Sequence, residues 1–200
     1  MGKRKRHRLL TGDPITQADD GALGDLGDEI GAALLALHHA PVEEAVARGV
    51  PDGSMSRRAL QDVLDRCRRD VLPLLAFAER EAGHALLDEL GAAPFVSLVH
   101  GDLGPEHMLV RDDAVSGIID WTDAHVGDPA LDLAWGLHSS AEAFAAELTR
   151  VYAPDHDTLR RAALWHRLGP WHEVIYGLDE HRPDLVVSGL AGVRARLPAS

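Results

Sequence analysis

The sequence predicts a mainly α-helical domain with a small insert of short strands and loops. Through most of the chain, apolar residues recur at three- and four-residue steps, which places them on one face of successive helices. Between residues 95 and 120 the pattern changes to short apolar runs separated by Asp, Gly and Pro, which is typical of small strands joined by turns. The expected order is helices, a β-loop insert and then more helices.

Helices before the insert are expected in two stretches. The first runs from about residue 21 to 39 and ends before Pro41, although glycines weaken it at its start. After a loop over residues 48–54, the second runs from about 60 to 90 and is broken or kinked at Pro73, which lacks the N–H that a helix interior needs. Each stretch places its apolar residues on one side.

The insert and the segment after it are expected to contain three strands and four helices. Asp128 should cap the first of these helices and Pro129 should occupy its first position, because Asp accepts from free helical N–H groups and Pro has none to leave unpaired. The strands are expected at 95–99, 108–110 and 117–120, and the helices at 129–138, 140–152, 157–178 and 183–196.

Composition narrows the class of partner. The chain has 200 residues, of which 46% are hydrophobic, enough for one domain with a sizeable core. Its formal charge of −12 argues against nucleic-acid binding and favours a small cationic partner. The single cysteine, Cys67, cannot form an internal disulfide, and no secretory signal or membrane-spanning run is visible. We therefore expect a cytoplasmic protein without a membrane partner, and the sequence leaves its oligomeric state open.

Ionisable residues gather in the insert. The loop over residues 100–110 holds His100, Asp102 and His107 between glycines and a proline, which can fix side chains without a helix or a strand ladder. A second carboxylate, Asp120, follows an apolar strand, where a buried scaffold can present a side chain to a cleft. We expect these two Asp and two His side chains to converge.

Three motifs in this region carry a family resemblance. They are H-G-D-x-x-x-x-H at residues 100–107, I-I-D-W at 118–121 and G-D-P-x-x-D-L-A at 127–134. Together they resemble the aminoglycoside phosphotransferase and choline-kinase-like family. With His107 and the helix end at 33–41, the chain is most similar to the macrolide phosphotransferases of that family.

The resemblance covers residues 10–197 and implies a fold. It implies the C-terminal lobe of a protein-kinase-like fold, with the N-terminal β lobe missing. Residues 1–18 would be a basic arm and hinge remnant, and residues 19–200 would be the kinase-like C-terminal lobe.

The resemblance also implies roles for five residues. Asp102 would be the catalytic base that orients the substrate hydroxyl and accepts its proton. Asp120 would hold the Mg²⁺ that bridges the phosphates of ATP or GTP, and His107 would stand beside it where most of the family has Asn. Magnesium prefers oxygen ligands, so weak binding, a preference for Mn²⁺ or a phosphate contact are all open for His107. His100 and Asp132 would support the loop.

Two parts that kinases use to hold nucleotide phosphates are not visible. The only lysines are Lys3 and Lys5, in a basic run that we interpret as a solvated arm. Gly21, Gly24 and Gly27 follow a helical pattern and do not form a G-x-G-x-x-G loop after a strand. The residues that bind the phosphate donor are therefore unknown. We favour a fragment or mis-started gene product over an inactive relic or one half of an enzyme completed by another chain.

The working hypothesis is transfer of a nucleotide γ-phosphate to a hydroxyl of an aminated small molecule. The substrates that we expect are macrolide antibiotics first and aminoglycosides second. Whether this isolated lobe is active stays open. A non-catalytic relic or binding module for a cationic ligand is the alternative. A metal-dependent hydrolase that uses His100, Asp102, His107 and Asp120 is a weaker third hypothesis, because no closely spaced ligand pair lies on a helix.

The remaining aromatic and histidine residues are expected to be structural. Trp165, Trp171 and Tyr176 lie at helical steps, which is typical of a core, with an aromatic pocket wall as the alternative. Six histidines lack metal-ligand spacing, and most of them are expected at the surface or the core edge; they are His38, His39, His156, His166, His172 and His181.

Overall fold

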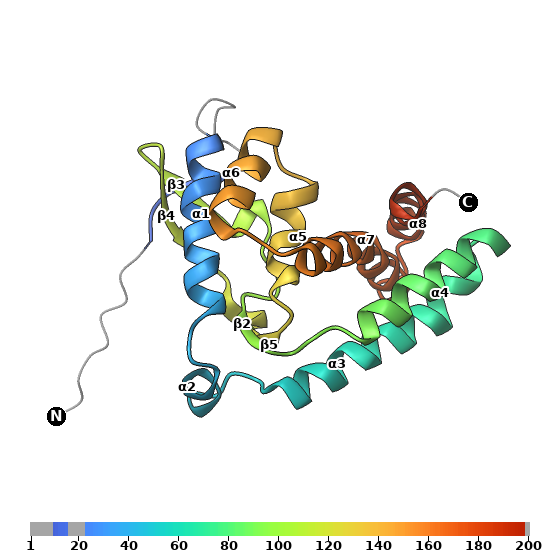
Figure 1. Ribbon diagram of the computed structural model, residues 1–200. Helices are drawn as coiled ribbons and strands as arrows, with labels where there is room; N and C mark the ends of the chain where they lie inside the picture. The colour runs from blue at the N-terminus through green and yellow to red at the C-terminus, as the bar shows by residue number, and fades with distance from the viewer. Residues whose placement is uncertain (1–9, 16–22, 199–200) are drawn as a thin grey trace.

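The computed structural model describes residues 10–15 and 23–198. Residues 1–9 and 16–18 of the expected arm and hinge lie outside the described residues. The helices in Figure 1 are α1 (Leu23–His38), α2 (Val42–Ala47), α3 (Gly53–Arg66), α4 (Phe77–Gly91), α5 (Ala130–His138), α6 (Glu142–Tyr152), α7 (His156–Asp179) and α8 (Pro183–Arg196). The strands are β1 (Asp13–Pro14), β2 (Ser97–Val99), β3 (Met108–Arg111), β4 (Ala114–Ile118) and β5 (His125–Gly127).

The strands form two small antiparallel sheets within a mainly helical structure, which confirms the predicted mixture of elements. One sheet has the order β1-β3-β4, and the other pairs β2 with β5. Figure 1 shows the β3–β4 hairpin beside α1. In the second sheet Val99 lies opposite His125. This pairing sets the loop that begins at His100 next to the segment that follows Asp120.

The predicted break at Pro73 is confirmed. After α3 ends at Arg66, the chain makes a π-helical turn over Cys67–Val71 and a 3₁₀ turn over Leu72–Leu74 before α4 begins at Phe77. A proline cannot donate the next helical hydrogen bond, so the long stretch becomes two helices that fold against one another.

Other elements differ from the sequence expectations. The helix α2 was not predicted; it is six residues long and buries none of them, so it carries no apolar periodicity. The strand β5 was not predicted, because three residues are too few to show alternation. The strand expected to reach residue 120 ends at Ile118, and Asp120 takes a left-handed conformation with φ of 58°.

Two hydrophobic clusters make up the core. One lies among α3, α4, α7 and α8 and includes the fully buried Trp171; the other lies among α1, α5, α6 and β3 and includes Phe144. The half-buried Trp165 packs against both clusters. Residues from α7 therefore contribute to both hydrophobic clusters. The helices around the two clusters are distant from one another in the sequence.

The glycines of α1 support packing. A Cβ atom on Gly27 would lie 2.4 Å from the carbonyl oxygen of Phe144, so only glycine lets α1 and α6 approach as closely as Figure 1 shows. Glycine lowers the stability of a helix, and this close packing of α1 against α6 compensates for that loss.

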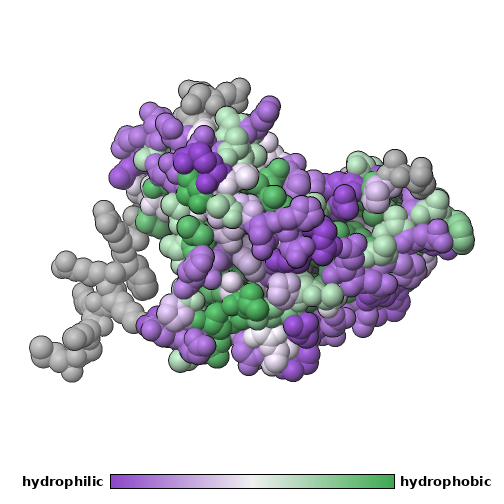
Figure 2. Space-filling view, viewed as in Figure 1, coloured by the Kyte–Doolittle hydropathy of each residue, from purple (hydrophilic) through white to green (hydrophobic). Residues whose placement is uncertain are grey.

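The face shown in Figure 2 carries mostly polar side chains, interrupted by apolar patches. Among residues 10–15 and 23–198, no helix is long and apolar enough to cross a bilayer.

Candidate active site

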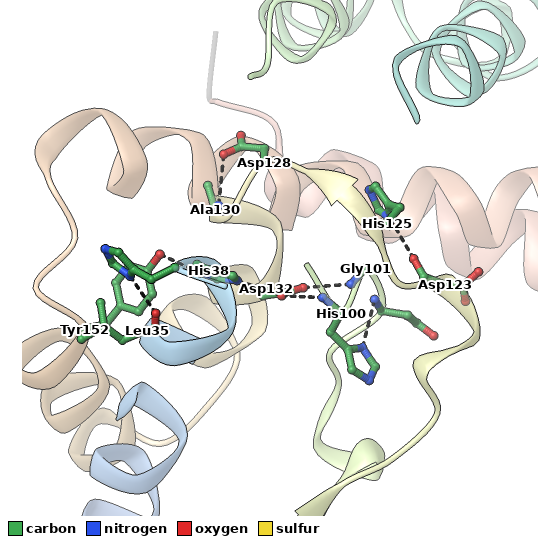
Figure 3. A network of polar contacts seen from close by, with 12 residues as sticks. Leu35, His38, His100, Gly101, Asp123, His125, Asp128, Ala130, Asp132 and Tyr152 are labelled. Atoms are coloured by element: carbon green, nitrogen blue, oxygen red, sulfur yellow. Dashed lines mark hydrogen bonds and ion pairs between the residues drawn. The ribbon is translucent and has the colours of Figure 1, made fainter. Parts of the chain in front are cut away.

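The loop after β2 is anchored by one buried carboxylate. Asp132, on α5, is 2% exposed and accepts three hydrogen bonds, from the backbone N–H groups of His100 (2.8 Å) and Gly101 (3.0 Å) and from Nε2 of His38 (3.0 Å). Figure 3 shows Asp132 lying between His38 and the loop. A buried carboxylate is tolerated when donors surround it in this way. The geometry suits the loop-supporting role predicted for Asp132.

His100 braces the same loop from inside. It is fully buried, its Nε2 donates to the carbonyl oxygen of Ile119 (2.8 Å), and its Nδ1 accepts from the N–H of Asp102 (3.4 Å). Between them, Gly101 has a φ of +89°, and a Cβ there would lie 2.4 Å from the carbonyl oxygen of Asp123. Only glycine fits this turn, so the local sequence fixes where the Asp102 side chain starts.

His38 belongs to this network, contrary to the expectation of a surface or core-edge histidine without a role. It is 8% exposed, and its Nδ1 lies 2.7 Å from the hydroxyl of Tyr152. Burial, and then the charge of Asp132, raise the pKa of Tyr152 to about 12. The phenol therefore keeps its proton and donates it to Nδ1, which leaves Nε2–H to donate to Asp132.

The sequence did hold a signal for His38. Leu26, Ile30 and Leu34 are buried at four-residue steps along α1, and His38 is the next position on that face. A polar residue that continues the buried face of a helix needs a hydrogen-bond partner, and here Asp132 supplies it.

His107 and Asp120 lie next to one another. The Nδ1–H of His107 donates to the carbonyl oxygen of Asp102 (2.7 Å), so Nε2 carries the free lone pair, 3.9 Å from Oδ2 of Asp120. Oδ1 of Asp120 accepts from the Thr122 hydroxyl, which is the main cause that lowers the pKa of Asp120; His107 adds a smaller electrostatic contribution. The ionised carboxylate and the imidazole nitrogen thus form a pair of possible metal ligands.

Asp102 lies beside that pair and at a pocket of about 720 Å³. Asp102 is exposed and is one of the residues that line the pocket, as is Thr122, whose hydroxyl donates to Asp120. The His107 ring contacts the backbone of Asp102 and approaches the side chain of Asp120. The base candidate and the two metal-ligand candidates therefore lie close together, next to the pocket.

The pocket wall is mostly apolar and contains three carboxylates. It is built from α3, α5, α7 and the loops around residues 95, 102 and 123, with Leu60, Phe95, Trp135, Trp165 and Leu168 among its apolar side chains. Asp123 is exposed, whereas Asp128 is 2% exposed and already paired with Arg161 (2.9 Å) and Trp165 (3.0 Å). Within residues 10–15 and 23–198, no side-chain hydrogen bond or ion pair engages the carboxylates of Asp102 and Asp123, which are therefore suited to a cationic ligand.

The aromatic cluster divides among three locations. Trp171 is in the core as predicted, Trp165 lines the pocket, and Tyr176 is 57% exposed. A helix that curves around a pocket can place residues of one periodic set in different surroundings, so periodicity alone could not separate them.

The helix α5 begins one residue later than predicted. It starts at Ala130, so Pro129 occupies the N-cap position that was predicted for Asp128. Oδ1 of Asp128 still accepts from the N–H of Ala130 (3.1 Å), the first helical residue (Figure 3). Pro129, between them, needs no partner for a backbone N–H.

A hydrolytic metal centre is not formed. In the part of the chain that the structure describes, no three His, Cys, Asp or Glu side chains form a metal-binding group. Both ring nitrogens of His100, one member of the hypothesised set, are already engaged with Ile119 and Asp102.

The histidines near the pocket predict a pH dependence of stability. Burial, and then the charge of Arg196, lower the pKa of His166 to about 4, and burial also lowers the pKa of His138. Because the unfolded chain takes up these protons near pH 6.5, the stabilisation is complete above that pH and is lost as the pH falls towards 4. We expect a smaller free energy of unfolding at pH 5 than at pH 7.5, measured by urea denaturation.

The variant His166→Gln should reduce this difference. The exposed His156 provides the control, and His156→Gln should leave the difference unchanged. An equal pH dependence in wild type and His166→Gln would contradict the assignment.

A curated relative matches most of the chain. Viomycin phosphotransferase of Streptomyces vinaceus is 29% identical over 168 residues, which are 80% of this chain and 58% of that protein. The chain thus spans little more than half the length of this relative.

Solved structures share the fold. The GDP and kanamycin complex of APH(2")-IIia superimposes with a TM-score of 0.81 at 23% identity, over 95% of this chain and 69% of that one. The apoenzyme of macrolide 2'-phosphotransferase MphH from Brachybacterium faecium gives a TM-score of 0.72 at 27% identity, over 96% of this chain and 69% of that one. These likenesses confirm the kinase-like arrangement expected from the motifs.

The family model described as the phosphotransferase enzyme family, APH, matches residues 2–170, which is most of the chain. The motifs, the fold and this match agree, and the chain belongs to the APH phosphotransferase enzyme family.

Proposed function

We propose that this protein transfers the γ-phosphate of ATP or GTP to a hydroxyl group of an aminated small molecule bound in the pocket. One observation supports the proposal: the loop anchored by Asp132 carries both Asp102, which lines the pocket, and His107, whose Nε2 lies 3.9 Å from the Asp120 carboxylate. A phosphotransferase needs a base at the acceptor hydroxyl and a cation at the donor phosphates close to one another, because the phosphoryl group passes directly from donor to acceptor.

Asp102 acts on the acceptor. Its carboxylate accepts a hydrogen bond from the substrate hydroxyl, orients it and takes its proton as the hydroxyl oxygen bonds to the γ-phosphorus. The bond from that phosphorus to the bridging oxygen breaks, and the nucleoside diphosphate leaves. The backbone of this loop is held at His100 and Gly101 by Asp132, so the carboxylate starts from a fixed position.

Asp120 and His107 fit a divalent cation shared with the nucleotide. Magnesium in phosphotransferases usually takes one or two carboxylates, with phosphate oxygens and water completing its shell, and Asp120 supplies an ionised carboxylate. His107 offers Nε2, with Mn²⁺ as the alternative ion. When bound, the cation neutralises charge on the phosphates.

The pocket supports a bulky, partly apolar acceptor. The apolar wall can bury a hydrocarbon ring system, and the free carboxylates of Asp102 and Asp123 attract a positively charged amine. We therefore place aminated macrolides before aminoglycosides as substrates.

We further propose that residues 19–200 act as the kinase-like C-terminal lobe and residues 1–18 as an arm and hinge. Without a lysine after Lys5, the phosphate-binding lysine and the Gly-rich loop of kinases have to come from outside residues 19–200.

A phosphorylation assay tests the function. The chain, alone and joined to any lysine-bearing β-rich segment encoded upstream in frame, is incubated with γ-labelled ATP or GTP, Mg²⁺ and a panel of macrolides and aminoglycosides. A phosphorylated drug identified by mass spectrometry is expected. No product from either protein would contradict the proposal.

A binding module for a cationic ligand is the second candidate, favoured by the absence of a lysine from the body of the chain. Calorimetry separates the two functions. Drug binding that is unaffected by nucleotide and Mg²⁺ supports the binding module, and binding that requires both supports the phosphotransferase.

The variant His107→Asn tests the metal assignment. It replaces an imidazole nitrogen by an amide oxygen, which magnesium prefers, so the ratio of the Mn²⁺-supported rate to the Mg²⁺-supported rate should fall about tenfold. His39→Asn, at an exposed site, should leave the ratio unchanged. A ratio that is equal in wild type and His107→Asn would remove His107 from the ion site.

A further inference from the structure

A proline inside α7 frees a backbone carbonyl at the pocket. Pro170 has no N–H to donate to the carbonyl oxygen of His166 four residues earlier. Arg196, the last residue of α8, supplies the missing donor: its Nη1 lies 2.6 Å from that oxygen. This bond fixes the guanidinium at the pocket wall, where Arg196 and His166 are both lining residues.

The guanidinium keeps most of its hydrogen-bonding capacity. Arginine has five N–H donors, and within residues 10–15 and 23–198 only the carbonyl of His166 accepts from Arg196. No carboxylate in those residues forms an ion pair with it. A Cβ on Gly169 would lie 3.1 Å from Nη1, so the guanidinium rests against a helix position that has no side chain.

Two further polar side chains line the pocket with Arg196. They are Ser139 and His166, and the Ser139 hydroxyl lies 2.9 Å from Nε2 of His166. Burial and the nearby Arg196 keep His166 neutral at physiological pH, so the formal charge of the cluster comes from the guanidinium. A fixed cation in an otherwise acidic pocket is suited to an oxygen acceptor.

We propose that Arg196, His166 and Ser139 form a subsite that binds a carbonyl or carboxylate oxygen of the substrate. The inference rests on the proposed function, since it assigns the substrate to this pocket, and it narrows the substrate class. A ligand of this pocket carries an amine for the carboxylates and a carbonyl-type oxygen for Arg196. A polyamine without carbonyl groups is attracted by the carboxylates of the pocket but is repelled by the guanidinium of Arg196.

The competing explanation is that Arg196 serves only the free carbonyl of His166. The variant Pro170→Ala separates the two, because alanine restores the helical N–H donor to that carbonyl. In the Pro170→Ala background, Arg196→Gln should no longer lower the melting temperature, yet it should still weaken ligand binding.

Calorimetric titration of the full chain with two drugs provides the test. Erythromycin has one amine, a lactone and a ketone, whereas kanamycin has several amines and no carbonyl. Arg196→Gln should weaken erythromycin binding about tenfold, which equals about 1.4 kcal/mol, and should tighten kanamycin binding because a positive charge leaves the pocket. Arg194→Gln, in the same turn of α8 but paired with Glu79 (3.3 Å), should change neither affinity.

The carboxylate source is tested with 3-phenylpropionate, which has a carboxylate and no neutral carbonyl group. If the subsite takes a carboxylate, 3-phenylpropionate should bind in an Arg196-dependent way; if it takes a neutral carbonyl, only erythromycin should do so. Erythromycin affinity that is unchanged in Arg196→Gln, or is restored by adding Pro170→Ala, would overturn the subsite, as would wild-type protein that binds neither erythromycin nor 3-phenylpropionate. The proposed function fails separately, when binding depends on Arg196 but no nucleotide yields a phosphorylated drug.

Discussion

Replacing Asp102 by asparagine is expected to lower the rate of phosphate transfer by about 10²–10⁴-fold, the usual contribution of a positioned general base. The amide cannot accept the hydroxyl proton. Because the Asp102 side chain is exposed and no hydrogen bond to its carboxylate is found among the described residues, the melting temperature should stay close to that of the wild type. The rate at saturating drug and nucleotide is the quantity to measure.

The nearby Asp123 provides a matched control for this prediction. It is also an exposed carboxylate of the pocket wall, so Asp123→Asn removes the same charge from the same space. We expect Asp123→Asn to weaken binding of a cationic drug and to leave the saturated rate within a few-fold of wild type. Equal losses of saturated rate in both variants would mean that Asp102 acts only through its charge.

Replacing Asp132 by alanine is expected to cost about 3–5 kcal/mol of folding free energy, as is typical when one partner of a buried charged network is removed. The N–H groups of His100 and Gly101 and Nε2 of His38 would all lose their acceptor in a buried site. Urea denaturation at neutral pH measures the change. The catalytic loop should also become mobile, so any activity that remains should show a lower saturated rate.

Two further variants calibrate the Asp132 result. Asp112→Asn alters a side chain that is 90% exposed and should change stability by less than about 0.5 kcal/mol. Tyr152→Phe removes only the outer donor of the network, on Nδ1 of His38, and should cost about 1 kcal/mol. An Asp132→Ala protein as stable as Asp112→Asn would show that the loop is not anchored through Asp132.

Much of the helical part of the fold could be predicted because it depends on local periodicity. The break at Pro73 and the cap at Asp128 depend on the chemistry of one residue and its neighbours, and both are found close to their predicted positions. The elements that were missed carry little local signal. The helix α2 buries no residue, and β5 has three residues and forms only because β2 is available to pair with it.

The pocket could not be predicted in the same way. Its walls come from α3, α5 and α7, and the sequence does not state which faces of separate helices meet. Arg196 donates to the carbonyl oxygen of His166, which lies 30 residues earlier in the chain. To predict this bond, one would need to know that Pro170 leaves that carbonyl without a helical donor and also how α7 and α8 pack together. The motifs did suggest that Asp102, His107 and Asp120 lie near one another, and His107 contacts the backbone of Asp102 and approaches Asp120. The helices that complete the pocket at Asp102 could not be inferred from those motifs.

The most direct test of these site assignments is a crystal structure of the protein with Mn²⁺ and a non-hydrolysable GTP analogue, in which anomalous scattering locates the ion. We expect an ion held by the Asp120 carboxylate together with the nucleotide phosphates, and a terminal phosphate directed towards Asp102. An ion and nucleotide bound away from Asp120, or a terminal phosphate directed away from Asp102, would contradict these assignments.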